Sequence, residues 1–281
     1  MEKSHDKPAE TASDDPLGVK LLAFARAQMN AAEAHLAQPG NKRHSGVHLG
    51  RKCLRRTRAL LLLGNAQFRE SAASLIADIG QLGRGLSPLR DAQALTEALK
   101  RLAKTTQEAE LGAMPAMLEA ARARRDELLD RSLLRDPDMR SRRLRIHSMR
   151  ERLSGLDWHM LTEKSAKSAL QRSAERAEKA RKRAKKRDPQ HEAWHTYRRK
   201  MRRSQQQNTV LTEFAPHLAE HGAAAGRHAE QLGEAQDQVL LLARCGSRSP
   251  FTVTQRAVLR KVVRAQLARA RTKGAPADKH D

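Results

Sequence analysis

Apolar residues recur along the chain at intervals of three and four positions, the spacing that gathers them on one face of an α-helix. One such face is formed by Leu21, Leu22, Ala25, Met29, Ala32 and Leu36. A second is formed by Leu89, Ala92, Leu95, Leu99 and Leu102, and a third by Val258, Leu259, Val262, Val263 and Leu267. Strand-like alternation is absent from the sequence. The pattern predicts an all-α fold of about ten helices that pack as bundles with short connections.

Proline marks the expected helix starts, because it tolerates the first helical turn when a small polar residue precedes it. The pairs are Asp15-Pro16, Ser87-Pro88, Asp136-Pro137, Asp188-Pro189 and Ser249-Pro250. The last helix could instead begin after Thr252, since Thr252 and Gln255 have the spacing of a capping box. Outside the helical region, residues 1–14 are expected to be a disordered leader and residues 272–281 a disordered tail.

Composition agrees with a helical core and adds a strong charge. Hydrophobic residues make up 39% of the 281 positions but aromatic residues only 2%, which favours helix packing over a sheet sandwich. Lysine and arginine number 55 against 32 acidic residues, a formal net charge of +23. Such an excess predicts a polyanionic partner. Nucleic acid, an anionic membrane surface and polyphosphate all remain possible on charge alone.

Other features narrow the class of protein. The two cysteines, Cys53 and Cys245, have no Cys-x-x-Cys spacing, and neither a signal peptide nor an apolar stretch long enough for a membrane helix is visible. We therefore expect a cytoplasmic protein without membrane insertion. The sequence has no Walker-type loop and no carboxylate cluster beside the basic segments. We expect no enzymatic activity, no catalytic residues, no cofactor and no metal site, although His44 and His48, His191 and His195, and His217 and His221 are spaced i,i+4.

Two basic segments repeat each other. The sequence VHLGRKCLRRTR begins at Val47 and WHTYRRKMRR begins at Trp194. In helical geometry His48, Arg51, Arg55 and Arg58 share one stripe, which Lys52 borders. His195, Arg198 and Arg202 form the equivalent stripe, bordered by Arg199. No acidic residue occurs between Glu33 and Glu70 or between Glu192 and Glu213, so local ion pairs cannot neutralise either stripe.

The repeat continues downstream and predicts an internal duplication. Gln81-Leu82-Gly83 recurs as Gln231-Leu232-Gly233, and an acidic residue follows each, Asp91 and Asp237. Each aspartate could stabilise a helix N-terminus or orient an arginine of the stripe. The two halves are expected to span about residues 15–135 and 136–271 and to be pseudo-symmetric.

A third basic segment precedes the second copy. Arg172, Arg176, Lys179 and Arg183 fall on one helical stripe, and Ala169, Ala177, Ala180 and Ala184 supply small residues for close packing. A single basic helix face is usually solvated surface. Two matched stripes in windows without acidic residues favour a shared anionic ligand instead.

The stripes resemble the pattern of the CHAD family, the conserved histidine α-helical domain. That pattern is a histidine followed by arginine three, seven, eight and ten positions later, given twice. His48 is followed in this way by Arg51, Arg55, Arg56 and Arg58, and His195 by Arg198, Arg202 and Arg203. In the second copy, Gln205 stands at position ten in place of arginine. Gln206 follows it where the family usually has an aromatic residue. Leu89-Arg90-Asp91 is similar to the family's downstream element, which is weaker at Ala235-Gln236-Asp237.

The resemblance spans roughly Pro16 to Arg271 and implies two pseudo-symmetric helical bundles around a basic groove or pore. It also implies binding of inorganic polyphosphate, often at polyphosphate granules. The residues expected to contact it are those of the two stripes with the bordering Lys52 and Arg199, together with Arg56, Arg203 and Arg90, and the third basic segment, Arg172, Arg176, Lys179 and Arg183. The alternative is a nonspecific nucleic-acid-binding protein, which the scarcity of aromatic residues for base stacking makes less favourable.

Overall fold

The computed structural model describes residues 16–105, 112–187, 192–218, 241–242, 245–246 and 249–274. These residues form ten α-helices, five short 3-10 helices and no strand, which confirms the all-α fold. The α-helices are α1 (Leu17–Leu36), α2 (Arg43–Leu63), α3 (Asn65–Phe68), α4 (Ala73–Gly85), α5 (Ser87–Thr105), α7 (Met114–Arg135), α8 (Arg140–Ser154), α9 (Glu163–Lys185), α10 (Glu192–Phe214) and α12 (Val253–Gly274). The 3-10 helices are η1 (Gly40–Lys42), η2 (Arg69–Ala72), η3 (Pro137–Met139), η4 (Trp158–Met160) and η5 (Pro216–Leu218).

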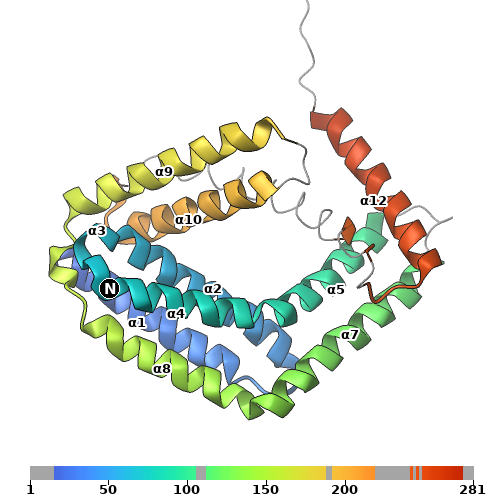
Figure 1. The fold of residues 1–281 in the computed structure, drawn as a ribbon, viewed down its shortest axis with the longest axis horizontal. Helices are drawn as coiled ribbons and strands as arrows, with labels where there is room; N and C mark the ends of the chain where they lie inside the picture. Colours follow the sequence, from blue (N-terminus) through green and yellow to red (C-terminus); the bar gives the residue numbers. More distant parts are fainter. Residues whose placement is uncertain are drawn as a thin grey trace, which may run out of the picture.

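Helices that follow one another in the chain pack against each other as pairs. Helix α1 lies against α2, α9 against α10, and α5 against α7, while α8 covers α1 and α10 contacts α2. In Figure 1, α9 and α10 lie along one side, α1, α2, α4 and α8 along the opposite side, and α5 and α7 lead away toward α12. The two helices that carry the repeated basic motif, α2 and α10, therefore contact each other.

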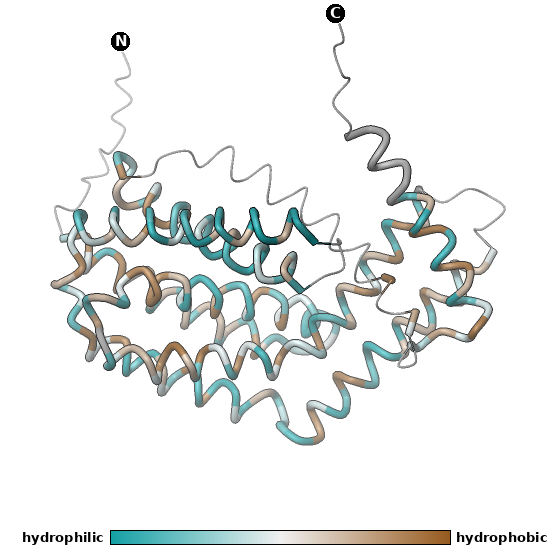
Figure 2. Tube along the Cα trace, turned by 45° about the horizontal axis from the view of Figure 1, so that its top comes forward, coloured by the Kyte–Doolittle hydropathy of each residue, from teal (hydrophilic) through white to brown (hydrophobic). Residues whose placement is uncertain are grey.

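The predicted apolar faces are the faces on which the helices pack. Leu21, Ala25, Met29 and Ala32 of α1 are completely buried, and Leu89 to Leu102 of α5 are buried at every predicted position. Figure 2 shows hydrophobic positions alternating with hydrophilic ones along the helices, as an amphipathic pattern requires. In α12, Leu259, Val262 and Val263 are buried, whereas the Leu267 side chain lies outside the described part of the chain.

The hydrophobic core is not split into one cluster before residue 135 and another after it. One large cluster joins side chains of α1, α2 and α4 with those of α8, the start of α9 and the end of α10. A second cluster joins α5, α7 and α12, and a small third one joins α9 and α10 through Ala180, Ala184 and Tyr197. Both large clusters thus combine residues from the two expected halves. The internal duplication itself stays a prediction.

Some of the predicted helix starts are confirmed. Helix α5 begins at Ser87, and α12 begins after Thr252, whose backbone N–H and side-chain oxygen exchange hydrogen bonds of 3.0 and 3.2 Å with Gln255. That reciprocal capping box selects Thr252 over the Ser249-Pro250 alternative. After Asp136-Pro137 the chain first forms η3 with Asp138 and Met139 at positive φ, so α8 starts only at Arg140. Asp136 then caps α8 by accepting a 2.7 Å hydrogen bond from the Ser141 N–H.

The end of the last helix differs from its predicted position. Helix α12 runs to Gly274, so residues 272–274 of the expected tail belong to its last turn. The leader 1–14, Asp188-Pro189, and the second downstream repeat with Asp237 lie outside the described residues. No helix in the described ranges is long and apolar enough to cross a bilayer.

Glycine brings α2 close to α1. A Cβ at Gly46 would lie 2.2 Å from the carbonyl oxygen of His35, and one at Gly50 would lie 3.2 Å from a Leu36 methyl group. Only glycine leaves room for this backbone approach. Because one side of α2 is pressed against α1 in this way, its arginine stripe is turned toward α4 and α10.

Candidate anion-binding pocket

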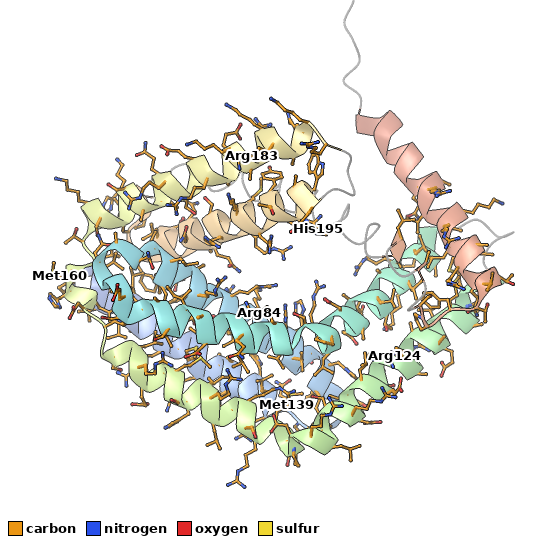
Figure 3. All side chains as sticks on the ribbon, viewed as in Figure 1. Arg84, Arg124, Met139, Met160, Arg183 and His195 are labelled. Carbon is orange, nitrogen blue, oxygen red and sulfur yellow. The ribbon has the colours of Figure 1, made fainter. Side chains whose placement is uncertain are left out.

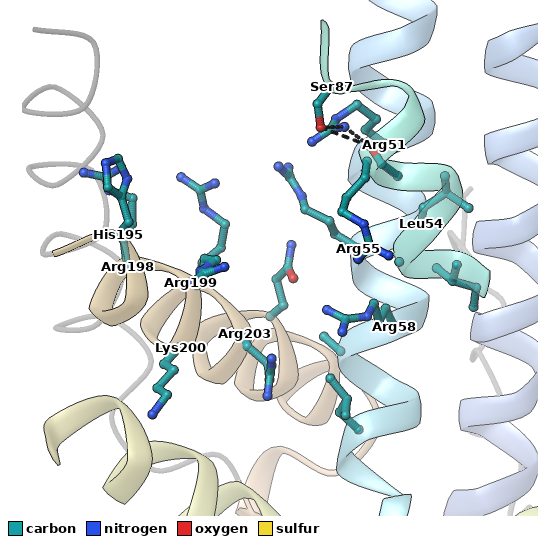
Figure 4. Close-up of a pocket in the computed structure, with 18 of the residues that line it drawn as sticks. Arg51, Leu54, Arg55, Arg58, Ser87, His195, Arg198, Arg199, Lys200 and Arg203 are labelled. Carbon is teal, nitrogen blue, oxygen red and sulfur yellow. Dashed lines mark hydrogen bonds between the residues drawn. The ribbon is translucent and has the colours of Figure 1, made fainter. Parts of the chain in front are cut away.

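A pocket of about 830 Å³ lies between α2, α4 and α10. Its lining includes eight arginines, one lysine and a single carboxylate, Glu192, which leaves an excess of eight positive charges with His195 neutral. Figure 4 shows the arginines of α2 on one wall and those of α10 on the other, with their side chains extending into the space between. The arginines are Arg51, Arg55, Arg58, Arg84, Arg198, Arg199, Arg202 and Arg203, and the lysine is Lys200.

The α2 wall is anchored to α4 and to the start of α5. The Arg51 Nη1 donates hydrogen bonds to the Gly83 carbonyl oxygen and, at 2.7 Å, to the Ser87 hydroxyl. The Arg58 Nε donates to the Ile76 carbonyl oxygen at 3.2 Å. Gly80 makes room for this contact, since a Cβ there would come within 3.3 Å of the Arg58 Nε. These bonds fix where two of the guanidinium groups enter the pocket.

The α10 wall is tied directly to α2. The Gln207 side chain is buried, and its Nε2 donates a 2.8 Å hydrogen bond to the Ala59 carbonyl oxygen of α2. Such a hydrogen bond from a side chain to a helix carbonyl oxygen fixes the position along α2 at which α10 crosses it. It sets α10 so that Arg202 and Arg203 lie across from the α2 arginines.

None of the eight pocket arginines forms an ion pair with a carboxylate within the described ranges. By contrast, arginines on outer faces are paired, for example Arg152 with Asp78 at 2.6 Å and Arg181 with Glu178 at 2.6 Å. The Nε–H groups of Arg51, Arg55 and Arg198 are buried and have no hydrogen-bond acceptor among the described residues. Buried donors of this kind favour an external acceptor.

Mutual repulsion and burial perturb these arginines. Burial, followed by the positive charges of Arg202, Arg51 and Arg90, lowers the pKa of Arg55 to about 10. Burial also lowers the pKa values of Arg51, Arg58, Arg198, Arg202 and Arg203, each with a neighbouring arginine adding to the effect. Perturbed ionisation in a concave site is typical of functional groups. An anion would remove both costs at once.

The two family histidines behave alike. Burial is the largest cause that lowers the pKa of both His48 and His195. The charges of Arg90 and Arg55 add to the effect at His48, and those of Arg198 and Arg199 at His195. In the ligand-free protein both histidines therefore gain a proton only at a pH below their ordinary pKa of about 6.5.

Eight of the sequence-predicted contact residues line the pocket, and eight do not. Those in the lining are Arg51, Arg55, Arg58, His195, Arg198, Arg199, Arg202 and Arg203. His48 and Arg90 lie beside it, since Arg90 acts electrostatically on both His48 and Arg202. Arg56 points away toward α1, where its Nη1 donates to the Gln28 side chain at 3.4 Å. Lys52 is exposed on α2, and Arg172, Arg176, Lys179 and Arg183 are exposed on α9.

Other side chains reach the pocket without having been predicted. Arg84 projects from α4, and Lys200 and Glu192 come from α10. Figure 3 shows Arg84 on α4, on the side of the pocket, and His195 at the N-terminal end of α10. Arg84 directly follows the repeated Gln81-Leu82-Gly83 element, so that element was the available signal. Gln206, where the family pattern has an aromatic residue, also lines the pocket.

The remaining sequence candidates have structural partners. The Asp91 carboxylate lies 3.3 Å from Arg90, and its charge also acts on Arg51, which favours the reading that it orients arginines. The His44 Nε2 lies 3.0 Å from the Asp126 carboxylate of α7. Across the described ranges no group of three or more His, Cys, Asp or Glu side chains converges as metal ligands would. His191 and His221 lie outside those ranges.

Comparisons with known proteins agree with the all-α fold. The family model described as "CHAD domain" matches residues 20–246. The crystal structure of the CHAD domain from the plant Ricinus communis is similar to this fold, with a TM-score of 0.65 and 21% sequence identity, covering 94% of this chain and 89% of that one. At that identity the likeness concerns the fold. No curated protein matches the chain.

Proposed function

This chain belongs to the CHAD domain family, and we propose that it binds inorganic polyphosphate in the arginine-lined pocket between α2, α4 and α10. The observation that carries the proposal is the set of buried, acceptor-free guanidinium N–H groups facing one another across a pocket with an excess of eight positive charges. Polyphosphate offers closely spaced oxygen acceptors. Arginine suits them because its planar fork donates paired hydrogen bonds and stays charged.

The lining favours phosphate over nucleobases. It contains no Phe, Tyr or Trp side chain for base stacking, and its apolar members are aliphatic residues such as Leu54, Leu62 and Ile79. Single-stranded nucleic acids are normally held by stacking as well as by charge. The proposal is for binding without catalysis, since the lining offers one carboxylate, Glu192, among eight arginines and one lysine. Such a protein would act in the cytoplasm, on polyphosphate granules or as a scaffold.

The test is competitive binding with matched variants. The pocket variant Arg55→Gln/Arg198→Gln/Arg202→Gln changes three arginines that donate no hydrogen bond to the described protein, so the fold should survive. The surface control Arg122→Gln/Arg140→Gln/Arg145→Gln removes the same charge from exposed positions on α7 and α8. Circular dichroism checks folding, and isothermal titration at physiological salt measures affinity.

The expected result is tight polyphosphate binding by the wild type and the surface control, with a loss of about tenfold or more in the pocket variant. Duplex DNA and RNA at equal phosphate concentration should not displace the ligand. If they displace it readily, or if both variants lose the same affinity, the protein is a nonspecific nucleic-acid-binding protein that acts through net charge.

A further inference from the structure

Helix α9 carries four cations that the pocket does not use. Arg172, Arg176, Lys179 and Arg183 are all exposed, and their spacing of four, three and four places them on one stripe of about 16 Å. The face of α9 that packs consists mainly of alanines, since Ala166, Ala169, Ala177, Ala180 and Ala184 are buried together with Leu170. Small residues bring α9 close to α10, so the long basic side chains remain on the outside.

Carboxylates on α9 are engaged elsewhere. Glu178 forms hydrogen bonds of 2.6 and 2.7 Å with Arg181, which lies on a different side of the helix. Glu175 accepts a 3.4 Å hydrogen bond from Gln171. Consequently none of the four stripe cations has an ion-pair partner in the described part of the chain. Glu175 has i,i+4 spacing to Lys179 and i,i+3 spacing to Arg172, but among the described residues it forms an ion pair with neither.

The α9 stripe continues the pocket. Arg203 belongs to the pocket wall, and Arg58 inside the pocket and Arg176 on α9 both lower its pKa, after burial, which is the largest cause. In Figure 4, Lys200 extends from α10 toward α9. Arg203 therefore lies near a cation of the pocket, Arg58, and near a cation of the α9 stripe, Arg176, and it links the two surfaces.

We propose that the α9 stripe, Arg172, Arg176, Lys179 and Arg183, is a second contact surface on which a polyanion that leaves the pocket past Arg203 continues. This inference rests on the proposed function, since it assigns the path of the same ligand outside the pocket. A short oligophosphate fills the pocket alone. A long chain engages both surfaces, and the second contact is intramolecular once the first is made, so it adds affinity without a second association cost.

The experiment compares two ligands and three variants. Tripolyphosphate probes the pocket and long-chain polyphosphate probes both surfaces. The α9 variant is Arg172→Gln/Arg176→Gln/Lys179→Gln, and the pocket variant and the three-charge surface control are those described above. Isothermal titration at several salt concentrations gives each affinity and its salt slope.

The α9 variant is expected to bind tripolyphosphate like the surface control but to lose about tenfold in affinity for the long chain. Its salt slope should be shallower by about 0.7 for each lost contact, if polyphosphate behaves like single-stranded nucleic acid. Long-chain affinity equal to that of the surface control would overturn the inference, and so would an equal loss with both ligands. Failure of the proposed function shows separately, as tripolyphosphate binding that the pocket variant leaves unchanged.

Discussion

Arg55 of α2 and Arg202 of α10 face each other across the pocket, and Arg202 is the strongest single charge acting on Arg55. The two residues are 147 positions apart in the sequence, and their helices are joined by the hydrogen bond from the Gln207 side chain to the Ala59 carbonyl oxygen. Burial, and then the charges of Arg202, Arg51 and Arg90, hold the Arg55 pKa at about 10, so the ligand-free pocket contains a buried cation that its neighbours repel. Such a cation costs stability in the ligand-free protein.

The first prediction concerns that repulsion. Replacing Arg55 with methionine keeps an unbranched side chain and removes the buried charge, so we expect the ligand-free protein to gain about 1–3 kcal/mol of unfolding free energy. Urea denaturation measures it. The same variant should bind polyphosphate more weakly. Arg56→Met is the matched control, because Arg56 points toward Gln28 and outside the pocket, and it should not stabilise. Destabilisation by Arg55→Met would contradict the prediction.

A second prediction concerns salt and anions. Ions screen the repulsion between pocket arginines, so raising the salt concentration should increase the melting temperature of the ligand-free wild type. Polyphosphate at 100 times its dissociation constant should add about 2.7 kcal/mol by mass action. Differential scanning calorimetry measures both effects. In the pocket variant both should shrink, whereas the surface control should respond like the wild type.

A third prediction is the pH dependence. The folded pKa values of His48 and His195 lie below the ordinary value of about 6.5, so below that pH the unfolded chain takes up protons that the folded protein does not. The histidines' contribution to stability is present above about pH 6.5 and is lost as pH falls through it. Phosphate favours the protonated rings, so polyphosphate affinity should rise over the same range.

The His48→Gln/His195→Gln variant isolates this effect. Its stability and its affinity should be less dependent on pH between 8 and 5 than those of the wild type, as measured by urea denaturation and isothermal titration. Comparing the two proteins cancels the titration of every other group, including the terminal phosphates of the ligand. Identical pH profiles for the two proteins would show that the histidines do not titrate with binding.

A fourth prediction tests the joint between the basic helices. Gln207→Leu removes the hydrogen bond to the Ala59 carbonyl oxygen and should cost about 1 kcal/mol of stability. Polyphosphate affinity should also fall, because α10 would no longer be held at a fixed height on α2. Thr209→Ala serves as the control, since the exposed Thr209 hydroxyl bonds only within α10, and its effect should stay within about 0.5 kcal/mol. Equal effects of the two substitutions would mean that the joint does not position the site.

The sequence by itself determined the local structure and the positive charge of the candidate site. The apolar faces of α1 and α5, the start of α5 at Ser87 and the capping box at Thr252 depend on spacing within one helix, so they could be predicted from neighbouring residues. The two arginine stripes of α2 and α10 follow from the same periodicity. Their shortage of nearby acids indicated an anionic partner before any packing was known.

Only the tertiary structure decided which cations share one space. Helix periodicity cannot tell which stripe faces another helix, because that depends on contacts made far away in the chain. Gly46 and Gly50 press α2 onto α1, which turns Arg55 into the pocket, while Arg56, one residue on, is directed to Gln28. Packing through alanines leaves Arg176 on the outer face of α9. Arg84 enters the pocket because α4 packs beside α2, a contact that no local pattern encodes.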